Sequence, residues 1–173
     1  MKEDDPYDEA SRFGARSRWQ GIQSLLIGST VLDVGCGHGD GCEFVPEGMS
    51  YWGIDINATG RPYRERYWSA YKHNQKVHFY EGDIRDLLEK WYVWHTIVCL
   101  ETLEHLHDGL EVAQRLKEHC LRLIVSVPEN RTGQGEVNNG HVLTGLTSAD
   151  FPGFIKMKTS TRRYSMFLLW DVS

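Results

Sequence analysis

Carboxylates and histidines stand at positions in this sequence where they could bind a ligand or move a proton. Asp33 and Asp55 each lie at the end of an apolar, strand-like run, and Glu101 follows a third such run. An acid at the tip of a buried strand can accept hydrogen bonds from ribose hydroxyls. Glu104 and His105 follow Glu101 at i+3 and i+4, which would place all three on one face of a helix beginning there. These residue types therefore predict a nucleoside site with acid–base groups beside it.

A glycine-rich loop follows the first of these runs, with glycine at every second position over 35–41. Such a loop lets the backbone approach a ligand closely, and the amides of Gly35, Cys36 and Gly37 could donate hydrogen bonds to it. In a dinucleotide-binding loop the third glycine lies three residues after the second, but this chain has Asp40 there. An acid would repel a pyrophosphate. The loop therefore favours a ligand without phosphates over a nicotinamide dinucleotide.

Predicted strands and helices alternate along the chain, which places the strand ends and their acids at one edge of a parallel sheet. The apolar runs predict strands at 30–34, 50–54, 77–80, 96–100 and 121–127, and a closing antiparallel pair at 154–159 and 164–171. Helical patterns predict helices at 8–28, 61–76, 86–91, 108–119 and 147–151. Because Pro46 follows the glycine loop closely, the helix after that loop should be little more than one turn.

The fold class predicted from this order is α/β. We expect a three-layer, Rossmann-like, mostly parallel seven-stranded sheet with one antiparallel edge strand. Residues 1–173 are expected to form a single domain, in which the acidic residues 1–7 form a disordered tail.

The overall composition bears on which classes of function are plausible and on the cellular compartment of the protein. A net charge of −5 argues against a protein that holds nucleic acid mainly through its phosphates. The acidic N-terminus lacks the apolar core of a signal peptide, and the longest apolar runs are too short to cross a membrane. The four cysteines form no CxxC pair and no zinc-binding spacing. We therefore expect a cytoplasmic protein with reduced thiols.

Two predicted helices carry basic and aromatic residues whose role the sequence leaves open. The segment 61–76 combines arginines and lysines with Tyr and Trp side chains. Such a helix could bind nucleic acid, or it could bury its aromatic rings on the sheet and solvate its charges. The leading helix presents a similar choice. Its Arg12, Arg16, Arg18 and Trp19 could face a substrate, or the arginines could form a solvated basic face with the tryptophan in the core.

Four segments, taken in order, resemble the successive motifs of class I S-adenosylmethionine-dependent methyltransferases. They are Val31–Gly39, Gly53–Ile56, Glu81–Ile84 and Val98–Leu106. Their order and spacing fit that family from Thr30 to the C-terminus. The resemblance implies the Rossmann-like fold, methyl transfer as the activity and S-adenosylmethionine as the methyl donor.

The resemblance also implies how the motifs would hold that cofactor. Asp33 would lie near its ammonium group, Asp55 would take the ribose hydroxyls, and Asp83 with the Ile84 amide would bind the adenine edge. The residues expected to bind the cofactor are Asp33, Gly35, Cys36, Gly37, Asp55, Ile56, Asp83, Ile84 and Leu100. For Asp83 a second interpretation stays open, in which its carboxylate caps the helix that follows.

The acceptor site is expected beside the cofactor, lined by Glu101, His105 and His141. A hydroxyl nucleophile must lose its proton during methyl transfer, and His105 or His141 would be the general base. The loop 129–140 and the leading helix would close over the site. The expected acceptor is a small molecule methylated on oxygen or nitrogen.

Two alternatives remain open. Glu101, Glu104, His105 and His141 resemble the metal site of small-RNA 3′-end ribose 2′-O-methyltransferases, and the Glu-x-x-Glu-His run also resembles quinone-biosynthesis O-methyltransferases. These residues could hold Mg²⁺ or Mn²⁺ with an RNA 3′ end as substrate, although the acidic net charge argues against RNA. We therefore assign no metal ligand from the sequence. The second alternative is a module that binds S-adenosylmethionine without catalysis.

Overall fold

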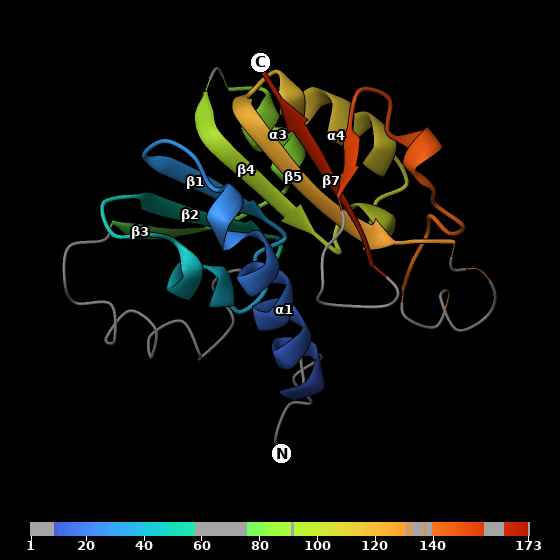
Figure 1. The fold of residues 1–173 in the computed structure, drawn as a ribbon, viewed down its shortest axis with the longest axis horizontal. Coiled ribbons are helices and arrows are strands. Elements are labelled where there is room, and N and C mark those ends of the chain that lie inside the picture. The colour runs from blue at the N-terminus through green and yellow to red at the C-terminus, as the bar shows by residue number, and fades with distance from the viewer. Residues whose placement is uncertain are drawn as a thin grey trace.

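The computed structural model of the chain describes residues 9–57, 76–90, 92–130, 132, 137, 140–157 and 165–172. These residues form a seven-stranded sheet with the strand order β3-β2-β1-β4-β5-β7-β6 (Figure 1). The strands are β1 (Thr30–Val34), β2 (Ser50–Asp55), β3 (Val77–Glu81), β4 (Trp94–Leu100), β5 (Cys120–Pro128), β6 (Ile155–Met157) and β7 (Ser165–Asp171). Every strand expected from the sequence is present, and only the bounds differ slightly.

The direction of the strands agrees with the predicted α/β class. Strands β3, β2, β1, β4 and β5 are mutually parallel, whereas β7 is antiparallel to both β5 and β6. The mostly parallel sheet with a reversed strand near its C-terminal edge is therefore confirmed. The reversed strand β7 lies between β5 and β6, so that β6 forms the outer rim.

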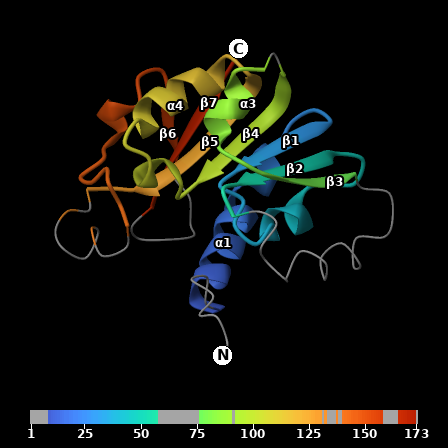
Figure 2. The ribbon, with the colours of Figure 1, turned by 180° about the vertical axis from the view of Figure 1, so that it is seen from behind.

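Helices cover both faces of the sheet, which gives the expected three layers (Figure 2). The helices are α1 (Glu9–Ile22), α3 (Ile84–Leu88) and α4 (Gly109–Lys117), with short 3₁₀ helices η1 (Gln23–Leu25), η2 (Asp40–Phe44), η3 (Leu103–His105) and η4 (Ser148–Asp150). Successive side chains of β1 point to opposite faces. Val31 packs in the buried cluster that contains Ile22 of α1, and Leu32 packs in the cluster that contains Leu116 of α4.

Local capping and backbone geometry decide where the short helices begin and end. After the glycine loop the chain forms only η2, as Pro46 predicted. Helix α3 begins at Ile84, earlier than the predicted start at Asp86, because the Asp83 carboxylate accepts the Arg85 amide at 2.9 Å and caps it. The leading helix ends at Ile22 rather than near Gly28 and continues only as η1.

Some expectations fall on parts of the chain that the structure does not describe. The tail 1–7 and most of the predicted helix 61–76 lie outside the described residues, as does much of the loop 129–140. Within the described ranges, no helix combines the length and the apolar character needed to cross a membrane.

Candidate functional site

A cavity of about 930 Å³ lies at the carboxyl ends of β1, β2 and β4, where parallel α/β sheets bind their ligands. Its volume falls within the range typical of small-molecule sites. It is lined by every residue proposed from the sequence to bind cofactor or acceptor: Asp33, Gly35, Cys36, Gly37, Asp55, Ile56, Asp83, Ile84, Leu100, Glu101, His105 and His141. Residues from distant parts of the sequence therefore surround one space.

Asp55 stands at the end of β2 with its carboxylate fixed by two backbone amides. Its Oδ2 accepts a hydrogen bond from the Gly37 amide at 2.9 Å, and its Oδ1 accepts one from the Asn57 amide at 3.0 Å. The residue is only 9% exposed. An ionised carboxylate has about four lone-pair positions, so the same group can still accept from hydroxyls of a ligand.

The glycine loop provides space rather than free amide donors. The amides of Gly35 and Cys36 both donate to the Ile54 carbonyl, at 2.9 and 3.1 Å, and the Gly37 amide donates to Asp55. The expectation that these three amides face the ligand is therefore wrong, because the loop folds back on the end of β2.

Gly35 is needed for the close packing of two loops at the edge of the cavity. It has a φ of +70°, and a Cβ at this position would lie 2.2 Å from the Thr102 hydroxyl oxygen. That hydroxyl donates toward the carbonyls of Val34 and Leu100, each at 3.2 Å. A side chain at position 35 would push apart the ends of β1 and β4.

Asp33 lies at the bottom of the cavity and is only 3% exposed. Its Oδ2 accepts a hydrogen bond from the Tyr51 hydroxyl at 2.5 Å. The pKa of Asp33 is raised to about 8: burial raises it most, the Tyr51 hydrogen bond lowers it, and the negative charges of Asp55 and Asp40 raise it. A buried carboxyl group that lines the cavity can bind a polar group of a ligand.

Asp83 has the capping role that the sequence left as an alternative. Its Oδ1 accepts the Arg85 amide, and its Oδ2 forms a 2.9 Å ion pair with the Arg85 guanidinium. The same guanidinium also pairs with Asp108 at 2.9 Å, which links α3 to the turn before α4. Both Asp83 and Ile84 line the cavity, so an additional contact with adenine stays a prediction.

Glu101 does not begin a helix. Its φ of +52° lies in the left-handed region, and the following 3₁₀ helix η3 begins only at Leu103. The Glu101 carboxylate instead accepts a hydrogen bond from the Ser126 hydroxyl of β5 at 2.8 Å. The expected shared helix face of Glu101, Glu104 and His105 is therefore wrong, because the turn separates Glu101 from the other two.

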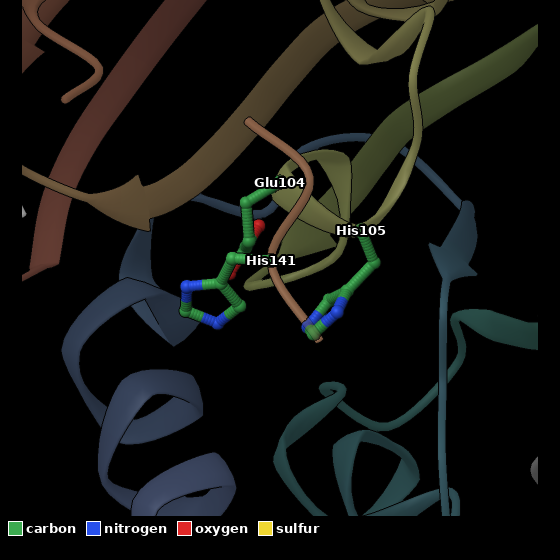
Figure 3. A group of neighbouring side chains, drawn as sticks. All are labelled: Glu104, His105 and His141. Carbon is green, nitrogen blue, oxygen red and sulfur yellow. The ribbon is translucent and has the colours of Figure 1, made fainter. Parts of the chain in front are cut away.

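Glu104, His105 and His141 form a separate cluster (Figure 3). One possible ligand atom from each residue lies within 4.8 Å of those of the other two. The imidazole rings meet edge to face, with centroids 4.8 Å apart and planes at 80°. A carboxylate and two imidazoles at this spacing can hold a transition-metal ion or share a proton.

Hydrogen bonds to the main chain hold the two halves of this cluster together. The Glu104 carbonyl accepts from the amides of Val142 and Leu143, at 2.8 and 3.0 Å. His105 Nδ1 lies 3.1 Å from the Gly140 carbonyl. Because a carbonyl only accepts, Nδ1 carries the proton and Nε2 is left as the basic nitrogen.

The surroundings of His105 also keep its imidazole neutral. Partial desolvation lowers the pKa of His105, the Gly140 hydrogen bond raises it, and the neighbouring His141 lowers it again. The neutral form is the one that can accept a proton near pH 7.

Helix α1 contributes residues that sequence reasoning left undecided. Arg16 forms an ion pair with Glu43 at 2.5 Å, outside the cavity, whereas Arg18 and Trp19 line it. Ala15 lines the cavity as well, and the spacing of 15, 18 and 19 corresponds to one helix face. That spacing was the available signal in the sequence.

Comparison with known proteins identifies a family and relatives of this chain. A family model described as "Methyltransferase domain" matches residues 9–164. The ubiquinone biosynthesis O-methyltransferase of Haemophilus ducreyi is 34% identical over 101 residues, which cover 53% of this chain and 41% of that protein. The corresponding enzyme of Actinobacillus pleuropneumoniae is 32% identical over 98 residues, with the same coverage. The matched stretch thus spans about two fifths of these curated relatives.

Solved structures share the fold at low sequence identity. Magnesium protoporphyrin IX methyltransferase from Synechocystis, crystallised with bound SAH, superposes with a TM-score of 0.70 at 21% identity and covers 95% of this chain and 90% of its own. The N-methyltransferase NodS from Bradyrhizobium japonicum, also with S-adenosylhomocysteine, gives a TM-score of 0.65 at 15% identity over 98% and 93% of the chains. At these identities the likeness establishes the fold.

Proposed function

Because this chain belongs to the class I S-adenosylmethionine-dependent methyltransferase family, we propose that its cavity binds that cofactor and delivers the methyl group to an oxygen or nitrogen atom of a small molecule. The observation that carries the proposal is the convergence of all the sequence-predicted residues on one cavity. S-adenosylmethionine supplies, when bound, a methyl group already activated on a positively charged sulfur. The protein must therefore align an acceptor and exclude water rather than activate the methyl carbon.

The residues around the cavity fit the polar groups of the cofactor. Asp55 has acceptor capacity left for ribose hydroxyls, and Asp33 supplies a carboxyl group for the ammonium. Among the described residues that line the cavity, Arg18 is the only Arg or Lys, so it is the proposed partner of the cofactor carboxylate. Half-buried Leu100 offers an apolar contact near the site of transfer.

His105 is the proposed general base. Its Nδ1 is occupied by the Gly140 carbonyl, its Nε2 is available, and its lowered pKa favours the neutral ring. His141 packs against it and is the second candidate. Glu101 borders the same space on a turn fixed by Ser126. A base is required by a hydroxyl acceptor and less so by an amine, which favours oxygen as the atom methylated.

The curated relatives also favour oxygen, since both are named O-methyltransferases. All four cysteines lie in the described part of the chain, are buried, and form no disulfide bond. Reduced thiols support the cytoplasm as the proposed location.

A metal-dependent ribose 2′-O-methyltransferase is the second candidate, and the cluster of Glu104, His105 and His141 favours it. One carboxylate and two imidazoles suit Mn²⁺ or another transition metal better than Mg²⁺, which prefers oxygen ligands. A bound ion would hold the hydroxyls of the acceptor, whereas Glu101 is not among the three residues whose possible ligand atoms cluster. The net charge of −5 disfavours an RNA substrate.

Calorimetric titration of the purified protein with S-adenosylhomocysteine tests the proposal. We expect stoichiometric binding, and we expect methyl transfer from S-adenosylmethionine to a panel of small phenols, alcohols and amines. No binding by the folded protein would refute the assignment. Binding without transfer to any acceptor would favour the non-catalytic module. Methylation of an RNA 3′ end that is lost on chelation and restored by Mn²⁺ would favour the second candidate.

A further inference from the structure

The wall of the cavity beside β1 and β2 carries acidic groups that are largely removed from water. Asp33 and Asp40 are each 3% exposed and Asp55 is 9% exposed, and all of them line the cavity. Arg18 is the only Arg or Lys among the described residues that line it. Asp55 accepts two backbone amides and Asp40 lies 3.8 Å from Arg16, whereas Asp33 has no cation among the groups that act on it, so its ionisation is costly unless a cation reaches it.

Asp33 is the most enclosed of these groups. Its Oδ2 accepts a hydrogen bond from the hydroxyl of Tyr51, whose side chain is fully buried. On the other side η2 approaches so closely that a Cβ on Gly41 would lie 2.8 Å from Asp33 Oδ2 and 2.4 Å from the Trp19 ring. This close packing leaves Asp33 nearly buried, at a position where it lines the cavity.

The groups that face Asp33 from β2, η2 and β4 are acidic or neutral, whereas helix α1 carries Arg16 and Arg18. Strand β2 contributes Tyr51 and Asp55, and η2 contributes Asp40 and the Cys42 thiol. Strand β4 contributes the buried Cys99 thiol. Helix α1 brings Arg16 to 3.8 Å from Asp40 and Arg18 to the cavity wall, and His38 lines the same cavity. None of the groups that act on the pKa of Asp33 is a cation, which agrees with the value of about 8.

We infer that Asp33 takes up the ammonium group of the cofactor as a carboxylate and releases a proton when it does so. The inference rests on the proposed function. In the ligand-free protein the carboxyl keeps its proton at neutral pH. On binding, the O–H bond of Asp33 breaks, the proton passes to the buffer, and the ammonium keeps its own protons. The Tyr51 hydroxyl then donates to a carboxylate, which makes the hydrogen bond charge-assisted.

Proton release makes the affinity for the cofactor depend on pH. With a pKa of about 8 in the ligand-free protein, the binding constant should rise about 50-fold from pH 6 to pH 8, since a proton must leave before the ion pair forms. The same linkage gives about 0.9 proton released per ligand bound at pH 7.

Titration calorimetry with S-adenosylhomocysteine, in two buffers of different ionisation enthalpy, measures this proton count directly. The matching probe is 5′-methylthioadenosine, which has the nucleoside but no ammonium group. We expect proton release with the first ligand and none with the second. Equal proton release with both ligands would assign it to another group and overturn the inference.

Two variants test whether the released proton comes from Asp33. Asp33→Asn should abolish proton release and flatten the pH profile. Tyr51→Phe keeps the ring but removes a hydrogen bond that lowers the pKa of Asp33, so the rise in affinity should move to higher pH. Tyr80→Phe is the control, because Tyr80 is half exposed on the neighbouring strand β3. If Asp33→Asn does not fold, the proton release measured with S-adenosylhomocysteine and with 5′-methylthioadenosine on the unaltered protein still tests the inference.

The possible outcomes separate this inference from the function on which it rests. Pronounced binding of S-adenosylhomocysteine with no pH dependence from pH 6 to 8 would refute the proton coupling and leave the proposed function intact. Unchanged proton release in folded Asp33→Asn would have the same meaning. No binding at any pH would refute both.

Discussion

The two sides of the cavity are built differently. On the cofactor side, Asp33 and Asp55 are strand residues, held by the parallel registers that pair Asp33 with Gly53 and Asp55 with Glu81. On the acceptor side, Glu101 lies in the turn after β4, His105 ends the short helix η3 that follows it, and His141 comes from a distant segment. The cofactor side is therefore formed by strands of the sheet, whereas the acceptor side is formed by the segments that follow the strands.

The difference lies in what fixes each side chain. Strand residues share their hydrogen-bond ladder with the buried core and cannot move without disturbing it. The acceptor side depends on a few local contacts: Ser126 with Glu101, Gly140 with His105, and the Glu104 carbonyl with the segment after His141. A fold can therefore keep one cofactor site while loops adapt to different acceptors.

The largest effect is expected on the cofactor side, from Asp55→Ala. The change removes the acceptor for ribose hydroxyls and leaves the Gly37 and Asn57 amides without their partner. We expect the affinity for S-adenosylhomocysteine to fall at least about 100-fold, as measured by calorimetry. Asp86→Ala, on an exposed position of α3, is the control and should bind normally. Unchanged affinity in Asp55→Ala would place the ribose elsewhere.

On the acceptor side, His105→Ala should lower kcat about 100-fold while binding of the cofactor stays unchanged, because a general base acts only in the transfer step. In the unaltered enzyme, activity should fall as the pH drops through the lowered pKa of His105, at which the ring gains a proton. The exposed His107, which does not line the cavity, gives the control His107→Ala. If His105→Ala also lost affinity for the cofactor about 100-fold, the cofactor side and the acceptor side of the cavity would not be separate.

An effect on stability, rather than on binding or turnover, is expected from Asp33→Asn. The carboxyl has a pKa of about 8 in the folded chain and ionises near 3.8 when unfolded, so the unfolded state loses its proton first and folded stability falls as the pH rises between these values. Removing the carboxyl should raise the free energy of unfolding by about 4 kcal/mol near pH 7 and by almost nothing below about pH 3.

Urea unfolding of the ligand-free protein across this pH range measures that gain. Asp86→Asn serves as the exposed control, and it should show no pH-dependent gain. If the stability of Asp33→Asn relative to the unaltered protein fell as the pH rose, the carboxyl would be ionised in the folded protein.

The smallest effect is expected from Ser126→Ala, which removes the hydroxyl that donates to Glu101. One hydrogen bond contributes about 1 kcal/mol, so kcat should fall only about fivefold. Ser24→Ala, at an exposed position of η1, should leave kcat unchanged. A loss as large as that of His105→Ala would show that Glu101 has a direct role in proton transfer.

The difference between the cofactor side and the acceptor side also explains which features could be predicted from the sequence. Apolar runs mark buried strands, so the positions of Asp33 and Asp55 follow from the pattern. The left-handed φ of Glu101 and the use of the loop amides by Ile54 depend on contacts between segments and leave no local signal. The 15, 18, 19 spacing on α1 was readable, but only the packed structure distinguishes the pocket-facing Arg18 from Arg16.

The place of β7 between β5 and β6 bears on the order of folding during synthesis. The outer edge of β5 stays open until residues 165–171 have left the ribosome, because β7 is its partner there. Until then β5 presents a long apolar edge that could pair with another chain. The growing chain therefore depends on late residues to protect an early-formed sheet, and substitutions in β7 should increase aggregation of nascent protein more than they alter the completed site.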